Sequence, residues 1–382
     1  MFPTLGRRLV HGFAAVAAAA LIPLSGAQAS PYSELVVFGD SLSDTGNVLA
    51  LTQAFTPATP FPTYSAAPGR FSDGPVWTEV LAAGLNLPNG ALPANLLFDG
   101  SSVISLGTPG GGNYAYGGAR TGLSGSAGAT TGLIGQLINW NGGVFTASSG
   151  LTRAANPDAL YVVLAGANDL RDARDNHPGS DAADAVARSA AAQGTATGVL
   201  NAVGLLAQAG ARHVLIGTLP DLGKTPEAAA KGVVDASTDV TLKFNAALAL
   251  GATQLEAQLA SFGIDLDLMT MDLYGLLEAI YDDAINNGGA HYGISNVTTP
   301  CLTKGSVSGQ YFAPDATASQ CDVSLFSDDL HPSAAAHALM GRLALAVVPE
   351  PTMLALLALA LLALGLSRRP APRAHDARLP RA

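Results

Sequence analysis

The sequence predicts an α/β domain with three layers, in which helices cover both faces of a mostly parallel sheet. Short apolar runs rich in β-branched residues, typical of buried strands, alternate in the second half of the chain with long Ala-rich segments, typical of helices. Strand–helix–strand alternation places parallel strands side by side and helices on the two faces. Residues 30–346 contain no repeat and no boundary that would divide them, so we expect a single domain.

The expected elements follow from local composition. A first strand at residues 34–38 (ELVVF) breaks at Gly39-Asp40-Ser41, and a turn and a helix are expected from Leu42 onward. Residues 56–75 predict an ordered loop, and residues 89–132, rich in Gly, Ser, Thr and Ala, show no sustained period. Further strands are expected at 159–164, 213–216 and 264–271, and helices at 76–85, 182–209, 233–259 and 333–347.

The first 29 residues have the pattern of a secretory signal. Arg7 and Arg8 precede an apolar stretch at 13–24, and Ala27-Gln28-Ala29 offers a small-residue cleavage site. A buried N-terminal helix or a membrane anchor is the alternative, but the apolar run is short for a span, which needs about 20 residues. We therefore expect cleavage before Ser30.

The other end carries a second signal. Residues 348–351 (VPEP) stop any helix, an almost purely apolar run follows at 353–366, and Arg368-Arg369 comes next. This order resembles the PEP-CTERM sorting signal of Gram-negative bacteria, over residues 347–369, with a basic tail at 370–382. The resemblance implies recognition by a membrane-embedded exosortase, transient anchoring through the helix, and release to the cell surface or medium. A plain C-terminal anchor is the alternative.

Charge and cysteine content narrow the class of partner. Residues 30–351 carry 12 Lys and Arg against 28 Asp and Glu, a net charge of −16, with no basic stripe. Nucleic acid is therefore not an expected partner. The two cysteines, Cys301 and Cys321, show no CxxC or Cys/His spacing that would predict a metal or redox site. In an exported chain we expect them to form a disulfide.

A nucleophile and its proton acceptor can be assigned from spacing. Ser41 lies at the carboxyl end of the first strand, where open α/β sheets bind ligands. A nucleophilic serine needs a base, and the base needs a carboxylate to hold its tautomer. Of the seven histidines, only His331 has an acidic residue, Asp328, three positions earlier. Asp329 is a competing carboxylate, and helix capping is the structural alternative for both motifs.

Two further motifs can stabilise an oxyanion. Asn168, in Gly166-Ala167-Asn168-Asp169, follows the strand at 159–164 and offers an uncharged amide donor. Gly118, in GNYAYGGAR at 112–120, would leave a backbone amide unobstructed, as would the adjacent Gly117. A turn and a flexible loop are the respective alternatives.

Along the chain, the four motifs lie at residues 39–42 (GDSL), 112–120, 166–169 and 328–332 (DDLHP). In this order they resemble the conserved blocks of the GDSL (SGNH) hydrolase family, whose fold is flavodoxin-like. The likeness extends over residues 35–346 and includes GRFSDG at 69–74 and LPDLGKTP at 219–226, which are similar to the long-loop branch of plant lipases and bacterial secreted esterases. It implies Ser41 as nucleophile, Asp328 and His331 as its partners, and the Ser41 amide, Gly118 and Asn168 as oxyanion donors. No Gly-x-Ser-x-Gly motif is present, which disfavours an ordinary α/β-hydrolase.

The expected function is hydrolysis of a carboxylic ester through an acyl-enzyme, with no metal or cofactor. Small-molecule, lipid and acylated-sugar esters all remain open as substrates, because the residues that line a pocket cannot be chosen from sequence. One alternative is an acyltransferase or deacetylase that acts on an extracellular polysaccharide. Another is a non-catalytic surface-binding protein on the same fold, which the intact catalytic residues disfavour.

Overall fold

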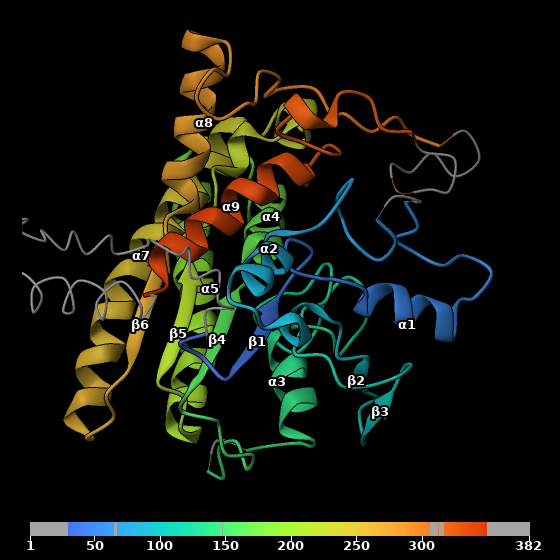
Figure 1. Cartoon of the computed structure of the whole chain (residues 1–382). Coiled ribbons are helices and arrows are strands. Elements are labelled where there is room, and N and C mark those ends of the chain that lie inside the picture. Colours follow the sequence, from blue (N-terminus) through green and yellow to red (C-terminus); the bar gives the residue numbers. More distant parts are fainter. Residues whose placement is uncertain (1–29, 65–66, 147, 306–311, 313–316, 350–382) are drawn as a thin grey trace, which may run out of the picture.

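The computed structural model describes residues 30–64, 67–146, 148–305, 312 and 317–349 (Figure 1). The expected secretory signal at 1–29, most of the sorting segment and the tail at 370–382 lie outside these residues. Within the part described, we find no helix that combines the length and the apolar character needed to cross a membrane.

The core of the domain is a parallel sheet. Its strands are β1 (Glu34–Gly39), β4 (Ala159–Leu164), β5 (His213–Gly217) and β6 (Asp267–Met271), in the order β1-β4-β5-β6. The register pairs Val37 with Val162, Val163 with Ile216, and Gly217 with Met271. Every residue of β4 is buried, as expected for a strand covered on both faces. The carboxyl ends of all these strands therefore meet at one edge.

The chain flanks β1 on both sides. β4 pairs with one edge of β1. Along the other edge, Val37 N–H donates to Gly112 O (2.9 Å) and Tyr114 N–H donates to Val37 O (2.7 Å). The chain leaves β1 toward the edge occupied by residues 112–114 and later enters β4 at the opposite edge. The connections therefore change direction at β1, and such a point is where an open sheet has a crevice at its carboxyl end.

Helices form the two outer layers, which confirms the predicted three-layer α/β/α architecture. On one face, α5 (Ala182–Ala209) packs against α7 (Val234–Ser261), α4 (Ala167–Asn176) and α3 (Leu133–Asn141). On the other, α2 (Trp77–Gly84) packs against α9 (Ala334–Val347), which crosses in front of the sheet in Figure 1. α8 (Leu273–Asn287) shares a hydrophobic cluster with α9 through Leu277, Ile280 and Ala336.

The remaining elements are short and connect these layers. α1 (Asn47–Phe55) extends away from the sheet in Figure 1. It begins at Asn47, after a turn at residues 41–43, in line with the turn and helix expected from Leu42 onward. The others are η1 (Pro88–Ala91), β2 (Leu96–Phe98), β3 (Val103–Ser105), η2 (Leu222–Lys224), α6 (Pro226–Lys231) and η3 (Cys321–Val323). The helices α3, α4 and α8 were not predicted from the sequence.

A buried histidine joins the two helices of the front layer. His337 of α9 is fully buried, and its Nδ1 accepts a hydrogen bond from Trp77 N–H of α2 at 3.3 Å. Burial, aided by the charge of His331, lowers the pKa of His337 to about 3. The ring therefore stays neutral in the folded protein at any pH above that value.

We predict that His337 makes the fold sensitive to acid. Below the usual His pKa of about 6.5 the unfolded chain takes up a proton that the folded protein cannot bind. The contribution of His337 alone should lower the free energy of unfolding by about 1.4 kcal/mol for each unit by which the pH decreases from roughly 6.5 to 3. In His337→Asn, whose Oδ1 can still accept from Trp77 N–H, that slope should be absent in urea titrations across this range. Parallel pH profiles for the two proteins would contradict the prediction.

Candidate active site

Side chains from the two ends of the domain meet at the carboxyl edge of the sheet. Ser41 lies just beyond β1, and His331 lies just before α9. His331 Nε2 is 2.9 Å from Ser41 Oγ, and His331 Nδ1 is 2.8 Å from Asp328 Oδ2. The arrangement is a serine–imidazole–carboxylate relay with both contacts at hydrogen-bond distance.

The turn that carries Asp328 fixes the direction of its carboxylate. Asp328 Oδ1 accepts from Leu330 N–H (2.8 Å) and His331 N–H (2.6 Å), which leaves Oδ2 for the imidazole ring. Asp329, the competing carboxylate, instead offers its backbone oxygen to Glu227 N–H at 2.8 Å. The acid in contact with the ring is therefore that of Asp328.

Three potential oxyanion donors line the same cleft as Ser41. Within the described ranges, neither Ser41 N–H nor Gly118 N–H has a hydrogen-bond acceptor. The Asn168 amide nitrogen donates to Ala119 O at 2.9 Å, so one of its two N–H groups remains for a ligand. Gly117 N–H is engaged, because it donates to Asp44 Oδ2 at 2.9 Å. Of the two adjacent glycines, Gly118 is therefore the one whose N–H is left for a ligand within the described ranges.

A buried polar network, which sequence reasoning missed, holds the glycine loop against the serine turn. Asp44 accepts backbone N–H groups from Gly46, Asn47 and Val48 as well as from Gly117. Burial raises the pKa of Asp44 to about 6, even though these hydrogen bonds lower it. In addition, Asn47 Nδ2 donates to the carbonyls of residues 113 and 115, on the strand-like segment beside β1. The network fixes the separation of Gly118 from Ser41.

The Asn168 side chain is oriented from its own helix. Arg171, one turn along α4, donates from Nη1 to Asn168 Oδ1 at 3.3 Å. The Arg171 guanidinium also forms a two-point ion pair with Glu227, whose Oε2 lies 3.0 Å from Arg171 Nε. Burial would raise the pKa of Glu227, but the pairs with Arg171 and Arg174 hold it at about 2. Arg171 therefore holds the side-chain oxygen of Asn168, and the second N–H of the amide can face a ligand.

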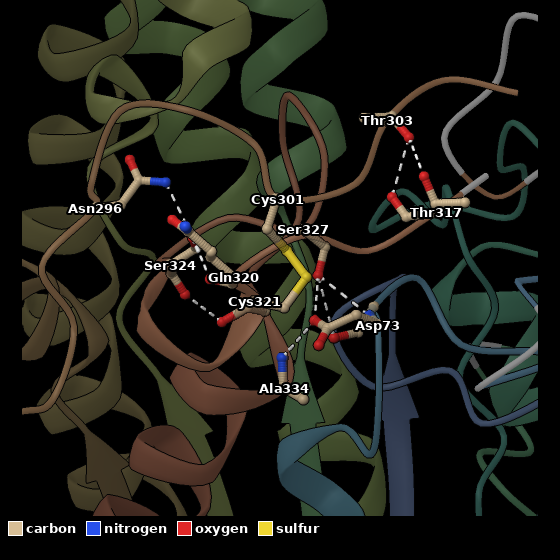
Figure 2. The surroundings of a disulfide bond; sticks show 12 residues. Asp73, Asn296, Cys301, Thr303, Thr317, Gln320, Cys321, Ser324, Ser327 and Ala334 are labelled. Atoms are coloured by element: carbon tan, nitrogen blue, oxygen red, sulfur yellow. Dashed lines mark hydrogen bonds between the residues drawn. A yellow bond between two sulfur atoms is a disulfide. The ribbon is translucent and has the colours of Figure 1, made fainter.

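Asp73 of the GRFSDG loop lies beside Ser327, which precedes Asp328, and beside Ala334 (Figure 2). Asp73 Oδ1 accepts from Ser327 Oγ and from Ala334 N–H, both at 2.8 Å, and so joins the turn to the start of α9. The predicted Cys301–Cys321 disulfide is present beside Asp73. The Asp73 carboxylate and the two sulfurs lie close enough to hold a metal ion, but sulfurs paired in a disulfide are not thiolate ligands.

The backbone at Cys301, one end of the disulfide, is hydrogen-bonded to the residues that precede Asp328. Cys301 N–H donates to Phe326 O (3.0 Å), and Leu302 N–H donates to Ser327 O (2.9 Å). These two bonds lead directly into the catalytic turn. The crosslink thus fixes one side of the site.

Two spaces open beside Ser41. One is a cavity of about 70 Å³ walled mainly by aliphatic side chains. The other is a cleft of about 450 Å³ that is lined by Phe61 and Phe71 as well as by Gly118. The Phe71 ring packs on the His331 ring, with centroids 5.2 Å apart. Ser41, Asn168, Arg171, Leu330 and His331 border both spaces.

The comparisons with known proteins identify the family of the chain and its sorting motif. The family model described as GDSL-like lipase/acylhydrolase matches residues 35–344, and the PEP-CTERM protein-sorting motif matches residues 347–369. Phosphatidylcholine-sterol acyltransferase of Aeromonas hydrophila is 26% identical over 81% of this chain and 88% of its own length. Esterase EstA of Pseudomonas aeruginosa is 27% identical over 86% of this chain and 48% of its own length.

A protein from the trpE-trpG intergenic region of Pseudomonas putida is 29% identical over 86% of this chain and 50% of its own length. The chain thus spans about half the length of these Pseudomonas relatives. Among solved structures, a lipolytic protein of the G-D-S-L family from Veillonella parvula matches with a TM-score of 0.36 and 16% identity, over 82% of this chain and 97% of that one.

We predict that the disulfide stabilises the domain. Cys301 and Cys321 are 20 positions apart, and closing a loop of this size is worth about 3 kcal/mol in the chain-entropy model. The double variant Cys301→Ser/Cys321→Ser should lose about that much free energy of unfolding in urea titrations. A reductant should lower the stability of the wild type and leave the double variant unchanged. Equal stability of the two oxidised proteins would disprove the prediction.

Proposed function

Because the chain belongs to the GDSL-like lipase/acylhydrolase family, we propose that it cleaves carboxylic esters through an acyl-enzyme formed on Ser41. The observation that carries this proposal is the pair of contacts made by His331, 2.9 Å from Ser41 Oγ and 2.8 Å from Asp328 Oδ2. A base in contact with both the nucleophile and an orienting carboxylate is what acyl transfer requires.

The first half of the reaction acylates Ser41. His331 Nε2 accepts the Ser41 hydroxyl proton as Oγ attacks the ester carbonyl carbon. Asp328 accepts the Nδ1–H of the ring and stabilises the imidazolium that forms. The tetrahedral intermediate collapses when its bond to the alcohol oxygen breaks and His331 Nε2 returns the proton to that oxygen. The alcohol leaves, and the acyl group remains on Ser41.

The second half releases the acid. Water replaces the alcohol, His331 takes a proton from it, and the new oxygen–carbon bond forms at the acyl carbon. Breakage of the bond to Ser41 Oγ, with return of the proton to it, completes the cycle. In both halves the negative oxygen is stabilised by Ser41 N–H, Gly118 N–H and Asn168 Nδ2. Support for these roles comes from the amides of Ser41 and Gly118, which have no acceptor in the part of the chain that the structure describes, and from the second N–H of the Asn168 side chain.

Transfer to an alcohol in place of water is the second candidate. The named acyltransferase activity of the Aeromonas hydrophila relative favours it, and so does the sorting signal, since it implies a destination where polysaccharide hydroxyls are acceptors. Both candidates share the acylation step, and they differ only in what attacks the acyl-enzyme. Removal of an acyl group from an extracellular polysaccharide would be the hydrolytic version of the same chemistry.

The sorting motif indicates export through the exosortase system of Gram-negative bacteria. For the processing, we propose loss of residues 1–29 and then of the hydrophobic segment within 347–369, with residues 30–346 as the hydrolase domain. The supporting features are the small-residue site before Ser30 and the basic cluster that ends the segment. Intact-mass measurement on protein from the native envelope would test both cleavages.

Substitution of Ser41 should abolish activity. We expect Ser41→Ala to reduce hydrolysis of p-nitrophenyl esters by at least about 10³-fold, because the nucleophile is removed while binding remains. The Tm should change by only a few degrees, since the lost hydroxyl borders the cleft and its removal costs the hydrogen bond to His331. Addition of glycerol or a saccharide as acceptor, followed by mass spectrometry of the products, separates hydrolysis from transfer. Full activity in Ser41→Ala would refute the mechanism.

Loss of the side-chain oxyanion donor should affect turnover more than binding. We expect Asn168→Ala to lower kcat by about 10²–10³-fold with a small change in KM, because the donor acts mainly on the charged intermediate. Asn286→Ala, at an exposed residue of α8 that bonds Asp282, is the matched control and should keep full activity. Equal kcat values for the two variants would exclude Asn168 from the oxyanion site.

A further inference from the structure

The small cavity beside Ser41 ends inside the hydrophobic core. Its walls include aliphatic and aromatic side chains that are each less than one-tenth exposed: Leu222, Leu277, Ile280, Leu325, Phe326 and Met340. Several of these belong to the cluster in which α8 packs on α9. A chain that enters this cavity from Ser41 therefore meets a floor of buried side chains.

The charged groups on the cavity wall are largely engaged by the protein itself. The Asp221 carboxylate accepts from Gly223 N–H and from Thr238 Oγ1. Arg171 is paired with Glu227. At the mouth of the cavity next to Ser41, Asp40 Oδ1 accepts from Leu42 N–H at 3.0 Å, whereas the buried Oδ2 has no partner among the described residues. The deeper wall is aliphatic and offers few hydrogen-bonding groups. A hydrocarbon chain is therefore the ligand that fits it best.

Building on the proposed function, we propose that this cavity is the acyl subsite and that it restricts the enzyme to esters of short-chain acids. An apolar cavity of about 150 Å³ is known to hold benzene, with its six carbons. At the same volume per carbon atom, the cavity of about 70 Å³ beside Ser41 holds roughly three carbons beyond the carbonyl carbon. Acetyl to butyryl groups fit, and octanoyl and longer chains require the core to open.

The second space fits the alcohol part of the substrate. The cleft of about 450 Å³ is several times larger and includes polar side chains, Thr52 and Ser126, beside its aromatic ones. It borders His331, whose Nε2 returns the proton to the departing alcohol oxygen. A large or polymeric alcohol can therefore be accepted while the acyl group stays small.

Opposite changes of one residue test the acyl subsite. The assay measures kcat/KM for p-nitrophenyl acetate, butyrate and octanoate. The wild type should prefer acetate or butyrate over octanoate by at least about tenfold, since one or two misplaced methylenes are worth 10–200-fold in a hydrophobic site. Leu277→Ala should raise the octanoate/acetate ratio about tenfold, and Leu277→Trp should lower the butyrate/acetate ratio by a similar factor.

Leu339→Ala is the matched control. Leu339 packs against the same cluster of α8 and α9 but does not line the cavity, so its truncation should leave both ratios unchanged. Phe61→Ala, in the cleft, should alter the preference among alcohols and not among acids. A wild type that prefers octanoate, or a Leu277→Ala profile identical to that of Leu339→Ala, would overturn the assignment.

A covalent probe keeps this test separate from that of the mechanism. p-Nitrophenyl alkylphosphonates label a reactive serine without turnover, and intact-mass analysis reports the label. We expect labelling with methyl and butyl phosphonates, loss of labelling in Ser41→Ala, and octyl labelling only in Leu277→Ala. Labelling that persists in Ser41→Ala means that the proposed mechanism fails. Ser41-dependent labelling that is equally fast for methyl and octyl means that only the acyl subsite is wrong.

Discussion

The hydrogen bond between His331 Nε2 and Ser41 Oγ joins residues 290 positions apart, and much of the structure serves to hold that distance. One partner follows the first strand of the sheet and the other precedes the last helix. Asp73, the disulfide and the Asp328 turn fix the histidine side. On the serine side, Gln136 of α3 bonds both the N–H and the carbonyl of Gly39. Because each side is attached to rigid elements, a short proton path exists before any substrate binds.

The oxyanion site depends on polar groups that carry a real energetic cost. Asp44 is fully buried, and burial raises its pKa to about 6. The carboxylate accepts three backbone N–H groups at the start of α1 (Gly46, Asn47 and Val48) and one from the glycine loop (Gly117). These amides would otherwise lack acceptors, which offsets the cost of burying the charge. Asp169 does the same for Thr121, whose N–H and Oγ1 both donate to it. Buried acceptors thus replace the regular backbone pairing that a strand or helix would provide.

The helices and strands were predictable from the sequence where the composition and the capping residues were distinctive. The helix at 182–209 was predicted with the bounds that it has, because Asp181 caps its start and Gly210, with φ 119°, ends it. α4 was missed because its sequence is mostly polar, with Leu170 as its one large apolar residue, and its helix is stabilised by packing on α5 and α7. In the site, the residues that resemble family motifs could be named from sequence. The choice of Gly118 over Gly117 could not, because it rests on Asp44, 73 positions away.

The two spaces beside Ser41 are built largely from elements that take no part in proton transfer. α8 and α9 supply the floor of the small cavity, whereas α1 and the loop around Phe71 line the aromatic cleft. The proposed oxyanion donors come instead from the serine turn, the glycine loop and the start of α4. On the proposed assignment, a change of Leu277 alters the space for the acyl chain and leaves the contacts of His331 in place. On our proposal, the sizes of the acyl and alcohol parts of a substrate are therefore set by residues other than those that transfer the proton, so the substrate range can change while the catalytic arrangement stays the same.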